Sequence, residues 1–374
     1  MTTSKPSNAN ATCVGPTSES AGKADTCAGC PNQAKCADGS SKKALEQDAA
    51  NIEQALQNIQ NVILVLSGKG GVGKSTVACQ LAQSLSCGLH DYNVGVLDVD
   101  ICGPSVPRML LGGDFMHKEV HKSGSGWAPV YVNENLAVMS IAFLLPDRDA
   151  AVVWRGPRKN GLIKQFLCET DWQSGGTAPL DYLIVDTPPG TSDEHISTVQ
   201  YLMSSLKNKS NDEAGPRIQA VVVTTAEEAS LSDVRKELNF CQKTSLPVVG
   251  VIENMTSFVC PFQSLLFTND NDEDCTNHVM QVLQSKCPEI LNMNVSTVLY
   301  PPSGGGPKSL AEKYNTEYLG CIPMDPNLLK SCEEGQCFVE AYENSTATKA
   351  LSSIVDRIIE KVPPAETDDI MQED

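Results

Sequence analysis

Short apolar runs alternate with amphipathic segments along most of the chain. The runs are nearly continuous in Val, Ile and Leu, which is typical of strands buried on both faces of a parallel sheet. This alternation predicts an α/β fold, a parallel sheet sandwiched by helices. The predicted strands are Val62–Leu66, Val94–Leu97, Leu136–Ile141, Leu183–Val185, Ala220–Val223 and Val248–Ile252, and the predicted helices are Arg158–Leu167, Glu194–Met203 and Leu231–Cys241.

A glycine-rich stretch, Ser67–Thr76, follows the first predicted strand and precedes a helical pattern. Glycines let the backbone turn tightly and point its N–H groups inward, and the helix N-terminus adds partial positive charge. Lys74 is placed to reach the β- and γ-phosphates of ATP, and Ser75 to bind Mg²⁺. A plain glycine turn does not explain the complete motif. The predicted P-loop NTPase site comprises Gly68, Lys69, Gly70, Gly71, Val72, Gly73, Lys74, Ser75 and Thr76.

Lys69 is a second lysine inside this loop, where phosphate binding requires no further charge. It lies too close to the strand to serve the oxygens that Lys74 reaches. It is either a solvated side chain or a group that leans toward the nucleotide of a facing subunit. The stretch resembles the deviant Walker A loop of the MinD, Mrp and ParA ATPases and of the nitrogenase iron protein, which implies that Lys69 reaches across a dimer.

Aspartates follow the apolar strands at the sheet edge where ligands bind in such folds. Asp186 suits a carboxylate that holds Mg²⁺, and Asp100 is placed to orient the attacking water. Asp98 is a candidate partner of Lys74 or of the metal. Turn and helix-cap roles are the alternative for each aspartate. The predicted catalytic residues are Lys69, Lys74, Asp100 and Asp186.

Three further residues are candidates for contacts with the adenine base. Asn254 ends the strand that begins at Val248, and its amide can hydrogen-bond an adenine edge. Pro323 and Asp325 end the last predicted strand and would flank the base from the other side.

Composition excludes several function classes. The chain has 374 residues, of which 41% are hydrophobic and 20% charged, and its formal net charge is −18. This charge repels phosphate backbones and anionic lipids, so we expect no nucleic-acid and no membrane partner. No run is long enough for a membrane span, and the N-terminal residues fit neither a secretory signal nor an arginine-rich presequence. We therefore expect a cytoplasmic protein, with the nucleus as a second compartment.

Residues 1–43 are polar and cannot bury enough surface to fold alone, so a disordered segment is expected. They contain Cys13, Cys27, Cys30 and Cys36, the full complement for tetrahedral zinc or for a 4Fe–4S cluster. Zinc sites usually combine two close pairs, whereas Cys13 stands alone, so a cluster fits better. The alternative, four free thiols without a metal or cluster, is disfavoured because exposed thiols are readily oxidised. By contrast, the cysteines in helical patterns are expected to be small buried apolar residues: Cys79, Cys87, Cys168 and Cys241.

The remaining segments complete the expected domain organisation. Residues 44–60 form a linker helix, 61–362 the ATPase domain, and 363–374 an acidic tail. Residues 261–298 interrupt the pattern as an inserted loop, whose acidic run Asn269–Asp274 is a solvated loop rather than a calcium site. An amphipathic helix at 346–362 is expected to pack on the core.

Together these features resemble the iron–sulfur cluster assembly ATPases of the Mrp/Nbp subfamily, in the longer type with an N-terminal cluster. The motifs are the spacing C-x₁₃-C-x₂-C-x₅-C, the loop Gly68–Thr76, Asp98–Ser105, Trp154–Asn160, Asp186–Gly190 and Ile252–Met255. The resemblance implies an ATP-hydrolysing scaffold that assembles a 4Fe–4S cluster and passes it to apoproteins, with cluster-targeting factors as partners. It implies a homodimer, or a hetero-tetramer with a shorter related ATPase.

One departure concerns a labile cluster shared between subunits. The family has a C-x₂-C pair just after the Asn254 strand, whereas here Cys260 is followed by Gln263, and an amide is a poor iron ligand. Cys275 or Cys287 can supply the missing thiolate, and Cys275 is the one that the inserted segment can more easily place beside Cys260. The alternative is that both are incidental thiols of the insertion.

Two other functions share parts of this pattern. A partitioning ATPase of the ParA/MinD type has the same loop, but the charge of −18 opposes its DNA or membrane partner. A zinc-stabilised nucleotide-dependent regulator would bind zinc through the N-terminal cysteines.

Overall fold

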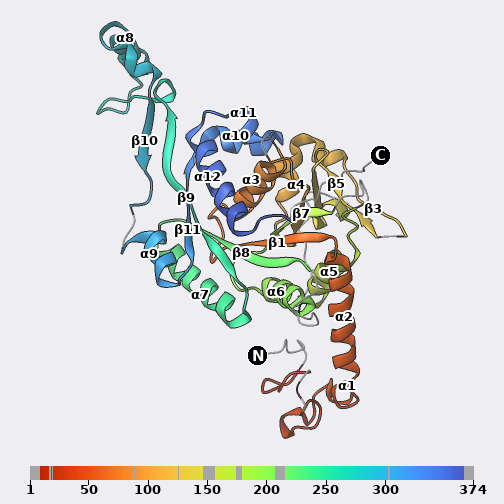
Figure 1. Cartoon of the computed structure of the whole chain (residues 1–374). Helices are drawn as coiled ribbons and strands as arrows, with labels where there is room; N and C mark the ends of the chain where they lie inside the picture. The colour runs from red at the N-terminus through yellow and green to blue at the C-terminus, as the bar shows by residue number, and fades with distance from the viewer. Residues whose placement is uncertain are drawn as a thin grey trace, which may run out of the picture.

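The computed structural model describes residues 9–16, 18, 20–87, 90–124, 126–145, 156–173, 179–206, 215–301 and 304–365. One large sheet lies at the centre, with helices on both faces and an arm that extends from one side (Figure 1). Within these residues the sheet runs β10-β9-β8-β1-β7-β2-β6-β5, and β11 also pairs with β9. The strands are β1 (Ile59–Leu66), β2 (Val94–Asp98), β5 (Val130–Tyr131), β6 (Leu136–Ser140), β7 (Leu180–Asp186), β8 (Arg217–Thr224), β9 (Val248–Pro261), β10 (Asn294–Val298) and β11 (Glu317–Met324); β3 (His121–Lys122) and β4 (Trp127–Ala128) form a separate hairpin.

The centre of the sheet is parallel, as the sequence predicts. β1 lies between β7 and β8, and β7 in turn pairs with β2. The register places Asp186 opposite both Val65 and Asp98, so three strands end at the same level. This edge carries the loop after β1 and the aspartates of β2 and β7, and it is the edge where ligands bind in open α/β sheets.

Alternate residues of the central strands face two hydrophobic cores. Ile63 and Val65 of β1 pack into one core, and Val62, Leu64 and Leu66 into the other. The first core is covered by α3 (Lys74–Ser86), α4 (Val106–Leu111), α11 (Phe338–Ala341) and α12 (Thr346–Lys361), with Leu328 of α10 (Pro326–Glu334) against it; the second is covered by α2 (Ser40–Leu56), α5 (Gly156–Glu169), α6 (Asp193–Ser205), α7 (Glu228–Thr244) and α9 (Gly306–Lys313). The helix expected at 346–362 is α12, and Leu351, Ile354, Val355 and Ile358 bury its apolar face.

The inserted segment extends a strand, which the sequence does not indicate. β9 was expected to end near Ile252, but it continues to Pro261 because β10 pairs with its distal half in antiparallel register. The tip of this arm carries α8 (Thr276–Lys286), far from the main body (Figure 1). The acidic run is an exposed turn, closed by a bridge between Thr268 and Asp274.

The N-terminal region runs into α2, which packs against α5 and α6. The linker helix expected at 44–60 begins earlier, at Ser40, and ends at Leu56, because Ile59 and Gln60 already belong to β1. Before it lie a one-turn 3₁₀ helix at Asp25–Cys27 and the short α1 (Gln33–Ala37). Among the described residues, no helix is both long and apolar enough to cross a membrane.

Candidate functional site

The loop between β1 and α3 has the backbone of a phosphate cradle. Gly71 and Gly73 adopt left-handed φ values of +82° and +81°, which disfavour residues with a Cβ. A Cβ on Gly73 would lie 2.2 Å from Nδ2 of Asn254, and one on Gly68 would lie 2.4 Å from the backbone carbon of Asp233. Both positions therefore require glycine, and the loop leads into the N-terminus of a 13-residue helix.

Lys74, Ser75 and Asp186 converge beneath this loop. Nζ of Lys74 lies 2.5 Å from Oδ1 of Asp186, and the Ser75 hydroxyl donates to Oδ2 at 2.6 Å. The Lys74 and Asp186 side chains are only 6% and 0% exposed. These are the three groups that phosphate and Mg²⁺ binding require, and the sequence assigns all three. The glycine-only cradle and this donor set fit a nucleotide with Mg²⁺.

Two further aspartates lie at the same edge. Asp98 is fully buried and accepts hydrogen bonds from the Ser140 hydroxyl at 3.0 Å and from the Asp100 backbone N–H at 3.1 Å. Burial and the nearby Asp186 carboxylate raise the pKa of Asp98 well above its ordinary value, although Lys74 acts in the opposite direction. Burial also raises the pKa of Asp100, again against the influence of Lys74. A more basic carboxylate at Asp100 is better suited to accept a proton from water.

Lys69 differs from Lys74 in its surroundings. Its side chain is exposed, and no carboxylate of the described chain lies within 4.0 Å of its ammonium group. The loop itself is fixed, because the Ser67 hydroxyl donates to the Lys69 carbonyl at 3.1 Å and the Gly190 N–H donates to the Ser67 carbonyl at 2.7 Å. The Lys69 side chain thus projects from a hydrogen-bonded loop and has no ion-pair partner among the described residues.

The predicted base-contacting residues occupy different environments. Nδ2 of Asn254 donates to the Val72 carbonyl at 2.9 Å, which locks the arm-bearing strand to the phosphate loop. Asn254 does not end its strand as expected, because β9 continues past it through Met255 at a φ of +57°. Pro323 is buried near the end of β11, and Asp325 is half-buried at the start of α10.

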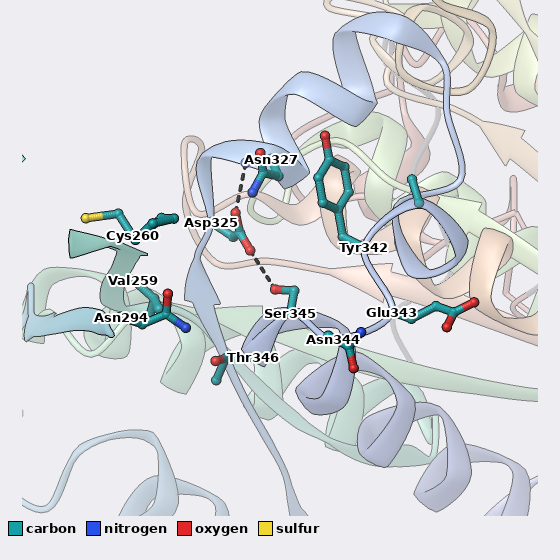
Figure 2. Close-up of a pocket in the computed structure, with 12 residues that line it drawn as sticks. Val259, Cys260, Asn294, Asp325, Asn327, Tyr342, Glu343, Asn344, Ser345 and Thr346 are labelled. Carbon is teal, nitrogen blue, oxygen red and sulfur yellow. Dashed lines mark hydrogen bonds between the residues drawn. The ribbon is translucent and has the colours of Figure 1, made fainter. Parts of the chain in front are cut away.

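Asp325 holds two helix N-termini together. Its carboxylate accepts from the Asn327 N–H at 2.8 Å and from the Ser345 hydroxyl at 2.6 Å, and Ser345 caps α12 (Figure 2). A cavity of about 330 Å³ adjoins this pair and reaches the end of β9. The Cys260 side chain points away from Asp325 there, and none of the twelve described lining residues belongs to the phosphate loop.

The sequence analysis did not predict a network of polar contacts around Lys159, beside the site. Nζ of Lys159 donates to Sγ of Cys102 at 2.8 Å and to Oε1 of Glu194 at 2.7 Å, which ties the loop after Asp100 to α6. These hydrogen bonds raise the pKa of Lys159, and the same contact lowers the pKa of Glu194 against the effect of burial. Lys159 belongs to the block Trp154–Asn160, of which Trp154 and Arg155 lie outside the described residues. The only sequence signal was membership of that block.

The N-terminal cysteines lie in a segment with defined turns. The Cys30 N–H donates to the Cys27 carbonyl at 3.1 Å, across a turn in which Gly29 has a φ of +72°. Nδ2 of Asn10 donates to the carbonyls of Thr26 and Ala28, at 2.9 and 3.1 Å. These bonds hold the stretch just before Cys13 against the C-x₂-C turn.

The fourth cysteine, Cys36, lies on α1, which packs against Gly22. Nε2 of Gln33 donates to the Gly22 carbonyl at 3.3 Å, and a Cβ on Gly22 would lie 2.4 Å from the Ala37 backbone nitrogen. Gly22 therefore packs directly on the helix that holds Cys36. The segment thus joins three stretches of chain that together contain the four cysteines.

Cys260 and Cys275 have separate surroundings on the arm. Cys260 is 5% exposed and pairs with Val295 of β10, while Sγ of Cys275 donates to the Phe267 carbonyl at 3.3 Å at the start of α8. Nε2 of Gln263 donates to the Leu291 carbonyl at 3.0 Å, so its amide supports the arm. Among the described residues, the only three metal-ligating groups with ligand atoms within 4.8 Å of one another are Cys87, Cys337 and Glu340.

The fold and the phosphate loop define a P-loop NTPase. A family model described as ParA, the NUBPL iron-transfer P-loop NTPase, matches residues 58–291 and 267–359, and the chain therefore belongs to that family. This confirms the resemblance to the Mrp/Nbp ATPases and the assignment as an ATPase.

The chain is also similar to solved structures. A nucleotide-binding protein from Archaeoglobus fulgidus, in complex with ADP and with Co, is 29% identical, with 78% of this chain and 92% of that chain covered at a TM-score of 0.54. The cell-division ATPase MinD of Pyrococcus furiosus is 18% identical, covering 80% and 99% of the two chains at a TM-score of 0.46. MinD of Aquifex aeolicus is 16% identical, covering 82% and 100% at a TM-score of 0.47.

Proposed function

We propose that this ATPase is a scaffold that assembles 4Fe–4S clusters and transfers them to cytosolic and nuclear apoproteins. Its membership of an iron-transfer NTPase family is the observation that carries the proposal. The four N-terminal cysteines lie outside the matched residues and add a ligand set of their own. Neither rival, a partitioning ATPase or a zinc-stabilised regulator, has an observation in its favour of comparable weight.

In this proposal each residue at the sheet edge has a separate task in ATP hydrolysis. Lys74 would bind the β- and γ-phosphates, and Ser75 and Asp186 would hold Mg²⁺, which would supply positive charge at the phosphate oxygens. Asp100 orients the attacking water. The Asp98 carboxylate holds Asp100 in place by accepting a hydrogen bond from the Asp100 backbone N–H. The amide of Asn254, which also donates to the Val72 carbonyl of the phosphate loop, contacts the edge of the adenine base. Pro323 and Asp325 contact the other side of the base. Exposed Lys69 completes the facing subunit's site in a homodimer or in a hetero-tetramer with a shorter ATPase.

Cys13, Cys27, Cys30 and Cys36 are proposed to hold the stable 4Fe–4S cluster. The thiolates of a tetrahedral zinc site lie about 3.8 Å apart, given a Zn–S distance near 2.3 Å. No three of these thiols lie within 4.8 Å of one another, although hydrogen bonds draw their segments together. Each thiolate of a 4Fe–4S cluster binds a different iron, so the four thiols of a cluster lie farther apart than those of a zinc site. Cys260, with Cys275, is proposed to hold the labile cargo cluster between subunits.

A cluster-transfer assay tests this function. The full-length protein is reconstituted anaerobically, and the activity regained by an apo 4Fe–4S enzyme is followed with and without ATP. We expect ATP to accelerate transfer in the wild type but not in Lys74→Ala, while Lys236→Ala, which removes an exposed lysine paired with Asp233, behaves as the wild type. Equal transfer by Lys74→Ala and wild type would contradict an ATP-dependent scaffold.

A further inference from the structure

Two thiols and a carboxylate meet at the far end of the phosphate-loop helix. Sγ of Cys87, Sγ of Cys337 and a carboxylate oxygen of Glu340 all lie within 4.8 Å of one another. Cys87 is separated from Cys337 by 250 residues of sequence, whereas Cys337 and Glu340 lie on neighbouring turns of one segment. Cys87 was expected to be a buried apolar residue like Cys79 and Cys241, which are fully buried, but it is half-buried and faces other ligating groups.

The backbone holds these three groups in place. Cys87 follows the last residue of α3, and its N–H donates to the Gln83 carbonyl at 3.0 Å. The Ala341 N–H donates to the Cys337 carbonyl at 3.0 Å, a helical turn that brings Glu340 to the same side as Cys337. Nε2 of Gln83 donates to the Gln336 carbonyl at 3.4 Å and so joins the two segments directly.

The chemistry of the three donors selects a class of ligand. Thiolates bind borderline-soft cations such as Zn²⁺ and Fe²⁺, whereas Mg²⁺ and Ca²⁺ require oxygen donors. Nδ2 of Asn133 and the Ser86 hydroxyl each lie 3.7 Å from Sγ of Cys87, where they support a sulfur that carries negative charge. Glu340 is exposed, so a bound ion would keep an open coordination position.

We propose that Cys87, Cys337 and Glu340 form a binding site for a thiophilic divalent cation, Zn²⁺ or Fe²⁺, distinct from the N-terminal and arm cysteines. Because α3 has 13 residues, this site lies about 20 Å along the helix from Lys74. A bound cation would fasten the C-terminal end of that helix to the segment before α12. The site is independent of the proposed cluster transfer, since it shares no residue with it.

Cobalt substitution tests the site in the full-length chain. The four N-terminal cysteines are replaced by serine, the protein is kept anaerobic and fully reduced, and Co²⁺ is titrated while thiolate-to-cobalt charge-transfer absorption is recorded. We expect about one equivalent of Co²⁺ to bind with this absorption and to be displaced by Zn²⁺. Cys87→Ser should abolish the band, and Glu340→Gln should weaken binding at least about tenfold.

Two matched variants keep the test specific. Cys168→Ser removes another half-buried helical cysteine, and Glu343→Gln removes a neighbouring exposed carboxylate, so both should bind Co²⁺ as the parent does. If the reduced parent binds no Co²⁺, or if Cys87→Ser retains the full band while circular dichroism shows a native fold, the proposed site is wrong.

Discussion

Lys74→Ala should destabilise the protein even without nucleotide, because it breaks a buried ion pair. The Lys74 ammonium and the Asp186 carboxylate lie 2.5 Å apart, and the two side chains are 6% and 0% exposed. Removing one partner of such a pair costs about 3–5 kcal/mol, since the remaining charge is buried without compensation. With an unfolding entropy near 2.1 cal/mol/K per residue, a chain of 374 residues should melt about 4–6 °C lower.

Two comparisons separate this effect from simple loss of a lysine. Lys236→Ala removes a lysine 2.8 Å from Asp233, but that lysine is 72% exposed, so the expected loss is about 0–1 kcal/mol. Lys74→Ala combined with Asp186→Asn removes both charges and should recover at least half of the lost stability. Calorimetry on the nucleotide-free protein measures all three melting temperatures.

The deficit of Lys74→Ala should also depend on pH. The pKa of Asp98 is raised by burial and by Asp186 and is lowered by Lys74, so losing Lys74 raises it further. An acid whose pKa is higher in the folded state binds more protons in that state than in the unfolded state. The stability of the folded protein therefore falls as the pH rises above about 4, the ordinary pKa of an aspartate. The deficit should therefore be larger at pH 8 than at pH 5. A deficit that matches Lys236→Ala and does not change with pH would refute this reasoning.

Three further variants test the proposed site residues. Asp100→Asn should bind ATP with nearly wild-type affinity but hydrolyse it about 10²–10⁴-fold more slowly; an equal loss of affinity in a binding titration would indicate a structural role instead. Mixing Lys69→Ala subunits with Asp100→Ala subunits should restore part of the ATPase rate, because one composite site keeps both groups, and no recovery in verified mixed dimers would count against a role across the dimer. In a background without the N-terminal cysteines, Cys260→Ala should remove the iron and sulfide of the labile cluster, and Cys275→Ala should do the same; a full iron count in Cys260→Ala would exclude that location.

The sequence predicts the central sheet because each of its strands is buried on both faces. Val62 and Ile63 face different cores, so both positions favour apolar residues. The strand therefore appears in the sequence as an uninterrupted apolar run. The phosphate loop is equally local, since its glycines and Lys74 lie within one short stretch. Of the three converging residues Lys74, Ser75 and Asp186, only Asp186 is distant in sequence. It could be predicted because it ends an apolar strand.

Features built from distant segments could not be predicted in the same way. β9 continues to Pro261 because β10, more than 30 residues later, supplies hydrogen bonds to its distal half, and β11 pairs with the part between. The Lys159 contacts with Cys102 and Glu194 join three loops or helices with no common periodic pattern. Helical spacing assigned Cys87 to a buried face, whereas the end of α3 at Ser86 turns it toward Cys337.

The iron and acid-labile sulfide content of the anaerobically isolated protein tests the central claim most directly. We predict equal amounts of iron and sulfide in the wild type, and a loss of about four of each in the variant Cys27→Ser/Cys30→Ser, with ATP binding retained. Cys168→Ser should keep the wild-type content. Zinc without sulfide in the wild type, or an unchanged iron and sulfide count in Cys27→Ser/Cys30→Ser, would contradict the account.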